Sequence, residues 1–390
     1  MTLNSFFITL TWGSFLFILI FYASYLLLLY YFNKKAFSNK RQLEFIYPTV
    51  SLLVPVYNEE KIIAKKIKNI EELVYPIDKI EIIFIDGKST DKTPEIIIDR
   101  SQKCQKYIKL IKQEKRDGYS RAVNQGILSS KGEIIMATDG ASFHYPDALL
   151  HLVKHFADSR IGAVTGKEVV LGKDCDMGPQ LEKSYRVFYD FMRKAETEMD
   201  STPDTKGEIL AVRKEICIAL IDQLRLSPNA SFDSCVPYQA KLMGYRTIYD
   251  EDAKYHEYAP SSFSDRMKVQ VRRATVLIGA MFLFKRLFLN KKSGKFGLLI
   301  LPVHFVMYCL IPSIFMVGLV FLIVSTFLDT LTVAILWVVP ILLLVVSKKS
   351  RSFIFSFIQS QFALVLALFR LARRKESLFI ESIPSTRDNV

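Results

Sequence analysis

Uncharged apolar runs flank a central region in which apolar strands and amphipathic helices alternate. The first run, Phe6–Phe32, carries no charge and is longer than the roughly 20 residues with which a helix crosses the hydrocarbon core. It is too long for a signal peptide and has no small-residue cleavage site before Asn33. We therefore expect residues 6–32 to form a retained N-terminal transmembrane helix.

The C-terminal membrane region, 296–371, contains further apolar blocks. Phe296–Thr326 and Thr330–Val346 carry no charge, whereas glutamines and an arginine interrupt Phe353–Leu371. If all of these blocks cross the bilayer, the basic tail 372–390 lies outside the cell, against the positive-inside rule. If Phe353–Leu371 instead lies in the interface as an amphipathic or re-entrant helix, the tail stays in the cytoplasm. We favour two C-terminal spans and keep a third as the alternative.

The distribution of basic residues predicts the orientation. Because cytoplasmic loops are enriched in Lys and Arg, we expect a multi-pass protein of the plasma membrane whose central domain faces the cytoplasm. A second basic segment, 276–295, predicts an interfacial helix between the central domain and the second span. The basic residues that follow the first span are Lys34, Lys35, Lys40 and Arg41.

The central domain, 47–275, has the pattern of an α/β fold with a mostly parallel sheet. Short apolar runs alternate with helical patterns, which favours parallel pairing and helices on both faces of the sheet. Ligands of such sheets bind outside the carboxyl ends of the strands. The predicted strands are Thr49–Val56, Ile80–Asp86, Tyr107–Ile111, Glu133–Asp139 and Ile161–Val170.

Composition narrows the partners. The formal net charge of +13 is not a nucleic-acid signal, because Lys and Arg cluster beside the membrane segments, where anionic headgroups attract them. The five cysteines are scattered without metal-ligand spacing. They fit a reducing cytoplasm and no disulfide framework.

Four polar segments at strand-to-loop junctions together resemble the family-two inverting glycosyltransferases. The similarity is strongest to the membrane-embedded branch with the synthases of cellulose, hyaluronan and poly-N-acetylglucosamine. It covers roughly Thr49–Ala280 and implies a GT-A fold and a nucleotide-diphosphate-sugar donor, with a UDP-sugar favoured. The segments are Val54–Glu60, Ile85–Thr93, Arg116–Gly126 and Ala137–Asp147.

The resemblance assigns the donor site. It places Asp86 against the uracil or ribose, although Asp86 could simply form the turn before Gly87. The turn from Val56 to Asn58 and Glu59 lines the nucleotide site in the family, although both polar residues could only cap a helix. Arg116 is the candidate for a phosphate or nucleotide contact.

A divalent cation is the expected cofactor, because Mg²⁺ or Mn²⁺ stabilises a departing diphosphate. Asp139 matches the first acid of the family's metal motif. Ala141 stands where the second acid or an Asn is usual, which weakens the expected site. Mg²⁺ can still bind through one carboxylate, phosphate oxygens and water.

The acceptor half begins at Gly207, in a segment that resembles the family's edge strand. Downstream, Asp233 matches the catalytic base, which takes the proton from the attacking hydroxyl, although Asp233 could instead cap the following helix. The preceding acid of the family is Phe232 here. Asp222 and Asp250 are weaker candidates for the base.

Gln270, Arg272 and Arg273 resemble the Gln-x-x-Arg-Trp signature of processive synthases. Arg binds two pyrophosphate oxygens at once through its planar fork, although these arginines could be plain juxtamembrane charges. The Trp is Ala274 in this chain, which removes a stacking surface for an acceptor sugar and argues against processivity.

We therefore expect a membrane-anchored inverting glycosyltransferase that moves a sugar to a carbohydrate hydroxyl in polysaccharide or cell-surface glycan synthesis. Transfer to a polyprenyl phosphate or another lipid carrier is the alternative. The departures at Ala141 and Ala274 also leave open a non-catalytic subunit that binds the donor or serves as a scaffold.

Overall fold

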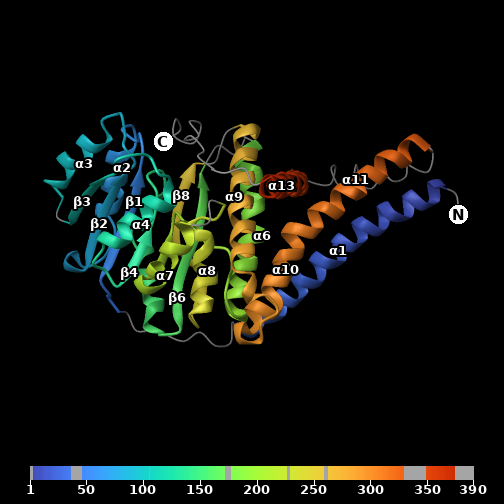
Figure 1. Ribbon diagram of the computed structural model, residues 1–390, viewed down its shortest axis with the longest axis horizontal. Coiled ribbons are helices and arrows are strands. Elements are labelled where there is room, and N and C mark those ends of the chain that lie inside the picture. Colours follow the sequence, from blue (N-terminus) through green and yellow to red (C-terminus); the bar gives the residue numbers. More distant parts are fainter. Residues whose placement is uncertain are drawn as a thin grey trace.

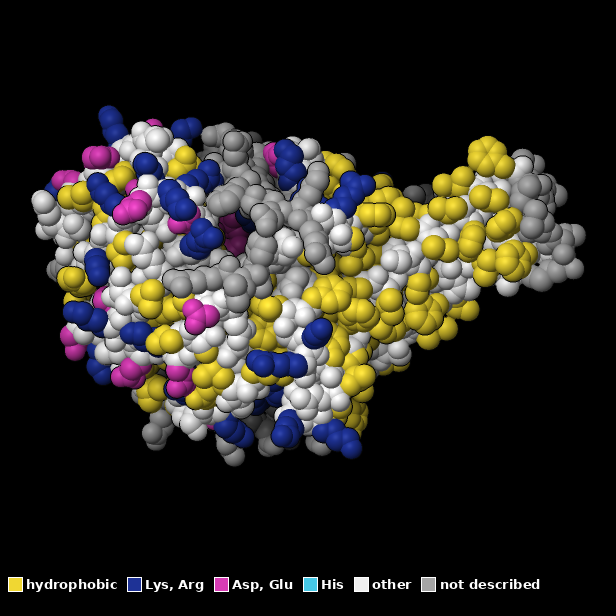
Figure 2. All heavy atoms as spheres, viewed as in Figure 1, with side chains coloured by type: hydrophobic (Ala, Val, Ile, Leu, Met, Phe, Trp, Pro, Cys, Tyr) yellow, Lys and Arg dark blue, Asp and Glu magenta, His cyan; other side chains and the backbone are white. Residues whose placement is uncertain are grey.

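The computed structural model describes residues 3–36, 46–104, 106–171, 177–225, 229–258, 262–328 and 348–373. Figure 1 shows an α/β domain from which a helical hairpin projects on one side. The hairpin pairs α1 (Leu3–Ala36) with α11 (Ile311–Leu328). Figure 2 shows that its surface is almost entirely apolar, whereas charged side chains cover the α/β domain.

One eight-stranded sheet, in the order β3-β2-β1-β4-β7-β6-β8-β5, forms the centre of the domain. The predicted strands are confirmed, and β1, β2, β3 and β4 pair in parallel. The sheet is mixed because β7 runs antiparallel to β4 and β6, and β5 antiparallel to β8. The strands are β1 (Val50–Val56), β2 (Ile80–Asp86), β3 (Tyr107–Lys112), β4 (Ile134–Ala137), β5 (Phe143–His144), β6 (Ile161–Leu171), β7 (Leu210–Arg213) and β8 (Arg246–Tyr258).

The segment that begins at Gly207 does not form an edge strand as predicted. Its strand, β7, lies inside the sheet between β4 and β6. Leu210, Ala211 and Val212 are fully buried, which fits a short apolar strand covered on both faces.

Helices cover both faces of the sheet, and each face has its own apolar core. The face that carries α4, α7 and α8 also packs against α9, which leads to the membrane. The helix α9 runs without a break across the boundary expected between residues 275 and 276. The helices are α2 (Ile63–Glu71), α3 (Thr93–Ser101), α4 (Tyr119–Ser129), α5 (Ala148–Val153), α6 (Met177–Met199), α7 (Lys214–Arg225), α8 (Phe232–Leu242) and α9 (Phe263–Leu283).

Three helices are long and apolar enough to cross a membrane: Ser5–Lys34, Phe296–Phe327 and Arg351–Ala372. The second contains the π-helical turns η5 (Phe296–Ile300) and η6 (Val306–Leu310) on either side of α10 (Leu301–Phe305). Its prolines, Pro302 and Pro312, explain the irregular turns, because proline removes a helical hydrogen bond and crowds the preceding turn. The predicted block Thr330–Val346 lies outside the described residues.

The last helix, α13 (Lys348–Ala372), has a different orientation from the hairpin. Figure 1 shows α13 end-on, whereas α1 and α11 lie in the plane of the view. It packs against α9 and α6. If α1 and α11 cross the bilayer, α13 therefore lies along the membrane, as the three-span interpretation expects.

A buried polar cluster joins the hairpin to the α/β domain. The Tyr25 hydroxyl donates to Glu196 Oε1 over 2.7 Å, and His304 Nε2 lies 2.6 Å from the same oxygen. These side chains come from α1, α6 and α10. Because unpaired polar groups are costly in such surroundings, the cluster fixes how the spans meet the domain.

Candidate active site

The loops after β1 and β2 are joined at the predicted nucleoside side of the site. The Val56 carbonyl accepts from Gly87 N over 2.9 Å, and Asn58 Oδ1 accepts from Thr90 N over 2.8 Å. Asn58 has a φ of 52°, in the left-handed region. The alternative that Asn58 and Glu59 cap the next helix fails, because α2 begins at Ile63 and has no side-chain cap.

Asp86 lies at the end of β2, next to the end of β1. It is buried and accepts hydrogen bonds from the backbone N–H and the hydroxyl of Ser89. The Arg116 guanidinium lies 4.0 Å from the centre of the Tyr57 ring. Arg116 therefore lies at the loop after β1.

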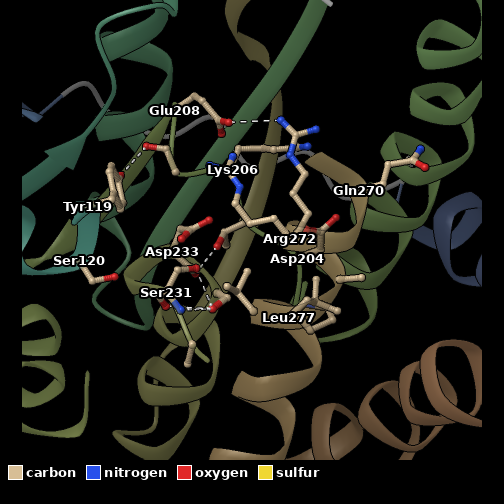
Figure 3. Close-up of a pocket in the computed structure, with 18 of the residues that line it drawn as sticks. Tyr119, Ser120, Asp204, Lys206, Glu208, Ser231, Asp233, Gln270, Arg272 and Leu277 are labelled. Atoms are coloured by element: carbon tan, nitrogen blue, oxygen red, sulfur yellow. Dashed lines mark hydrogen bonds and ion pairs between the residues drawn. The ribbon is translucent and has the colours of Figure 1, made fainter. Parts of the chain in front are cut away.

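A cavity of about 600 Å³ lies between the carboxyl edge of the sheet and α9. Five of the predicted site residues line it, namely Asp139, Asp233, Gln270, Arg272 and Arg273. Figure 3 shows Tyr119, Glu208, Asp233 and Arg272 around the same space. The other predicted residues, Val56, Asn58, Glu59, Asp86 and Arg116, are not part of its lining.

Asp139 follows β4 in a tight turn. Its Oδ1 accepts from the N–H groups of Ala141 and Ser142, at 3.2 and 2.8 Å. The fully buried Lys66 donates to Thr138 Oγ1 over 3.0 Å beneath this turn. Burial and the neighbouring Glu208 raise the pKa of Asp139, whereas Lys66 lowers it. Burial in turn lowers the pKa of Lys66 to about 7.

The donor set at Asp139 fits a hard divalent cation, because Mg²⁺ and Mn²⁺ prefer carboxylate oxygens. Burial and then Asp139 and Glu208 raise the pKa of Glu257. The structure thus gathers negative charge from β4, β8 and the loop before β7. Among the described residues, Glu208 and Glu257 influence Asp139 by charge and do not form a compact three-ligand group with it, so Ala141 leaves Asp139 as the carboxylate of this turn.

Asp233 lies in the first turn of α8, facing the cavity. Ser234 Oγ accepts from the N–H of the N-cap residue Ser231 over 3.0 Å, so this pair caps the helix. The Asp233 carboxylate is therefore not needed as the N-cap. Burial raises its pKa, while hydrogen bonds from Ser231 and the helix N-terminus oppose that rise.

Tyr119 lies beside Asp233. Its hydroxyl donates to the Gly207 carbonyl over 3.2 Å. A Cβ at Gly207 would lie 3.2 Å from the Tyr119 oxygen and 3.3 Å from Asp233 Cγ. Glycine at this position therefore allows the phenol and the carboxylate to approach each other. Burial and then Asp233, Glu208 and Asp139 raise the pKa of Tyr119, so it stays protonated.

The first half of α9 supplies the cationic side of the cavity. Arg273 Nη2 lies 3.5 Å from Glu208 Oε1. Within the described part of the chain, Arg272 has no ion-pair partner, and both side-chain polar atoms of Gln270 are buried without a hydrogen bond. Burial and the adjacent Arg273 lower the pKa of Arg272. An anion in the cavity would relieve this local excess of positive charge.

Sequence reasoning missed Glu208 and Lys66 and did not place Tyr119 at the cavity, and its interpretation of His144 as a solvated loop residue is wrong. His144 is buried, and its Nε2 lies 2.9 Å from the Glu208 carbonyl, so it supports the segment that carries Glu208. Glu208 could have been found from its position, because it is an acid just before the apolar run of β7. Lys66 lies in an amphipathic helix, where a lysine normally indicates the solvent face.

A second group of potential metal ligands, His151, Asp250 and Asp252, lies outside the cavity lining. Asp250 Oδ2 already pairs with Lys154 at 2.8 Å and His155 at 2.6 Å. Asp250 is therefore held in a structural ion-pair cluster outside the cavity, which argues against it as the base.

Comparison with known proteins shows which protein family and which solved structure the chain is similar to. Residues 51–220 match the model of the family described as Glycosyl transferase family 2. The mannosyltransferase PcManGT of Pyrobaculum calidifontis, solved with GDP-Man and Mn²⁺, superposes with a TM-score of 0.77 at 25% identity, covering 96% of this chain and 100% of that chain. Residues 51–220 thus resemble Glycosyl transferase family 2, and the chain has an α/β fold of the GT-A type with long apolar helices at both ends.

Curated relatives match about a third of the chain or less. A beta-monoglucosyldiacylglycerol synthase of Nostoc sp. is 38% identical over 125 residues, 32% of this chain and 26% of the relative. A dolichyl N-acetyl-alpha-D-glucosaminyl phosphate 3-beta-D-2,3-diacetamido-2,3-dideoxy-beta-D-glucuronosyltransferase of Methanococcus voltae is 32% identical over 108 residues, 27% and 33% of the two chains. The chain spans only about a quarter of the glycolipid synthase. These relatives do not belong to the cellulose and hyaluronan synthase branch that the sequence resembled.

Proposed function

We propose that this protein transfers a sugar, with inversion, from a nucleotide-diphosphate-sugar to a hydroxyl group of a membrane lipid's head. The observation that carries the proposal is the shared cavity. Asp139 and Asp233 line it at the sheet, and Leu277, Tyr308 and Leu364 line it beside the membrane helices. A reaction between a soluble donor and a lipid-borne acceptor needs both surroundings.

The donor would bind across the carboxyl edge of the sheet. Val56, Asn58, Glu59, Asp86 and Arg116 are the proposed nucleoside side, and Arg272, Arg273 and Gln270 the diphosphate side. Asp139 would hold Mg²⁺ or Mn²⁺, which supplies charge stabilisation to the diphosphate. The sequence favours a UDP-sugar, and the similar mannosyltransferase was solved with GDP-Man, so both nucleotides are donor candidates.

Asp233 favours a hydroxyl acceptor over a phosphate acceptor. A hydroxyl must lose its proton as it attacks, and a carboxylate on the acceptor side can accept it. A phosphate is already ionised at neutral pH and needs no base. A glycerol hydroxyl and a sugar hydroxyl on a lipid carrier both meet this requirement, in line with the names of the two curated relatives.

A carbohydrate hydroxyl on a growing polymer is the second candidate function. The cavity is lined by polar as well as apolar side chains, and the polar ones could contact the hydroxyls of a glycan. Ala274 lies in that lining and offers no ring on which a sugar could stack, which is the observation against a processive synthase.

The test is a panel of UDP- and GDP-sugars with purified protein and a lipid extract of the source cell, followed by mass analysis. A single-sugar product that partitions into organic solvent is expected, and the Asp233→Asn variant serves as the inactive control. A ladder of product sizes would favour the polymer synthase. Donor binding without turnover across the panel would contradict the proposal and favour a non-catalytic subunit.

A further inference from the structure

The wall of the cavity that faces the membrane is built by three elements distant in sequence. Leu277 comes from α9, Tyr308 from η6, and Ser360, Ala363 and Leu364 from α13. Asp139, which follows β4, and Asp233, in the first turn of α8, line the same cavity. The cavity therefore changes from charged to largely apolar toward the candidate span that contains Tyr308.

The helix α13 presents two unlike faces. Large apolar side chains point away from the protein, with Phe355 at 53% and Phe369 at 60% exposure, whereas Ser356 and Ala367 on the other face are buried. A helix whose small and polar residues face the protein and whose phenylalanines face outward suits a hydrocarbon environment. The outward residues are Phe355, Phe362, Leu366 and Phe369.

Buried hydrogen bonds hold α13 in this position. Arg266 of α9 is only 2% exposed, and its guanidinium donates to Gln359 and, over 2.9 Å, to Ser356 Oγ. Hydrogen bonds to a charged group are among the stronger ones in proteins. The position of Ser360, Ala363 and Leu364 along the cavity is thus fixed by a charged anchor one turn away.

We propose that the space between Leu277, Tyr308, Ala363 and Leu364 is a subsite for a hydrocarbon chain of the acceptor lipid, with α13 as its outer wall. The occupant must join a hydroxyl head to an apolar chain, because charged residues line one end of the cavity and the other end adjoins the span. The subsite rests on the proposed function, since it assigns the tail of the same acceptor. A soluble acceptor would leave this apolar wall without a ligand.

The test uses the full-length protein in nanodiscs of phosphatidylglycerol and phosphatidylethanolamine with a diacylglycerol that carries a diazirine at the end of an acyl chain. After irradiation, mass spectrometry locates the cross-links. We expect adducts on Leu277, Tyr308 and Leu364 in addition to adducts on Phe362 and Leu366, which contact bulk lipid in any case. Adducts confined to the outward residues would overturn the subsite.

Two variants fill the space from different helices. Ala363→Phe and Leu277→Phe should each reduce the inner adducts about fivefold and leave the outer adducts unchanged. A variant counts as folded if it keeps the wild-type elution volume and melting temperature. Inner adducts at the wild-type level in a folded variant would contradict the proposal. Inner adducts without any glycosylated lipid would support the subsite and contradict the proposed function. Glycosylated lipid with outer adducts alone would support the proposed function and contradict the subsite.

Discussion

At the scale of single residues, the site depends on carboxylates held in unlike surroundings. Asp139 is fastened to a backbone turn above the buried Lys66, whereas Asp233 lies at a helix terminus next to a phenol. Glu208 joins both by charge, because it contributes to the raised pKa of each. Two acids with different partners can serve different roles, one toward a cation and one toward a proton.

The pH dependence of turnover should reveal the base. Asp233 must be ionised to accept a proton, and burial raises its pKa, so kcat should fall on the acid side at a pH above the ordinary aspartate value of about 3.9. Asp233→Asn should lower kcat by about 10²–10⁴-fold and abolish this acid limb. The measurement is a kcat profile at saturating metal, so that protonation of Asp139 does not contribute.

The matched control is Asp222→Asn, which changes an exposed aspartate on α7. It should retain wild-type kcat and the same acid limb. A retained limb in Asp233→Asn would assign the proton to another group, with Glu208 as the first candidate.

Restoring the second acid should strengthen metal binding. Ala141→Asp adds a carboxylate two residues from Asp139, and we expect the Mn²⁺ concentration for half-maximal rate to fall about tenfold, or about 1.4 kcal/mol. Ala141→Ser, which adds no charge, should change it little. An unaltered metal requirement in Ala141→Asp would indicate that Glu208 and Glu257 already complete the site.

At the scale of elements, the positions of helix termini and strand ends explain most of the site. β1, β2 and β4 end at one edge of the sheet, and α4 and α8 begin beside it. α9 then brings Gln270, Arg272 and Arg273 to this edge in one continuous helix that also contacts α13. A displacement of α9 would therefore alter the diphosphate side and the acceptor side together.

The polar cluster between α1, α6 and α10 should stabilise this arrangement. Tyr25→Phe removes the hydrogen bond to Glu196 and should lower the free energy of unfolding by about 1 kcal/mol, measured by thermal unfolding in detergent. Tyr30→Phe, at a position 60% exposed on the same helix, should have no effect. Equal shifts in the two variants would show that the Tyr25 bond has no stabilising role.

At the scale of the whole molecule, the sequence predicted the strands, the N-terminal span and five residues that line the cavity. The strands and the span had a local signal, an apolar run, and Asp139 directly follows a predicted strand. Asp233, Gln270, Arg272 and Arg273 were found because their segments resemble family motifs. The antiparallel direction of β7 within the mostly parallel sheet was not predicted, because it depends on which neighbours β7 pairs with, and no local pattern encodes that. Lys66 and Glu208 were missed for the same reason, because their surroundings come from distant parts of the chain. Lys66 contacts Thr138, 72 positions away, and the Glu208 carbonyl contacts His144, 64 positions away.

The basic residues after the first apolar helix predict that the α/β domain faces the cytoplasm, and this prediction can be tested in cells. A cysteine at Phe6 should react with a membrane-impermeant thiol reagent added outside. A cysteine at Leu128, which is 67% exposed on the α/β domain, should react only after permeabilisation. The parent chain measures the background from native cysteines, and the reverse labelling pattern would place the domain outside the cell.

The contact between Tyr25 and Glu196 bridges 171 positions, and that between Glu196 and His304 bridges 108. During synthesis, the first span is therefore made long before the groups it must bind have left the ribosome. Contacts between residues far apart in the sequence form slowly. Until they form, the Tyr25 hydroxyl of the first helix lacks its hydrogen-bond acceptor. Chains that stop before His304 would lack the last member of the cluster, and quality-control proteases could recognise them by that defect.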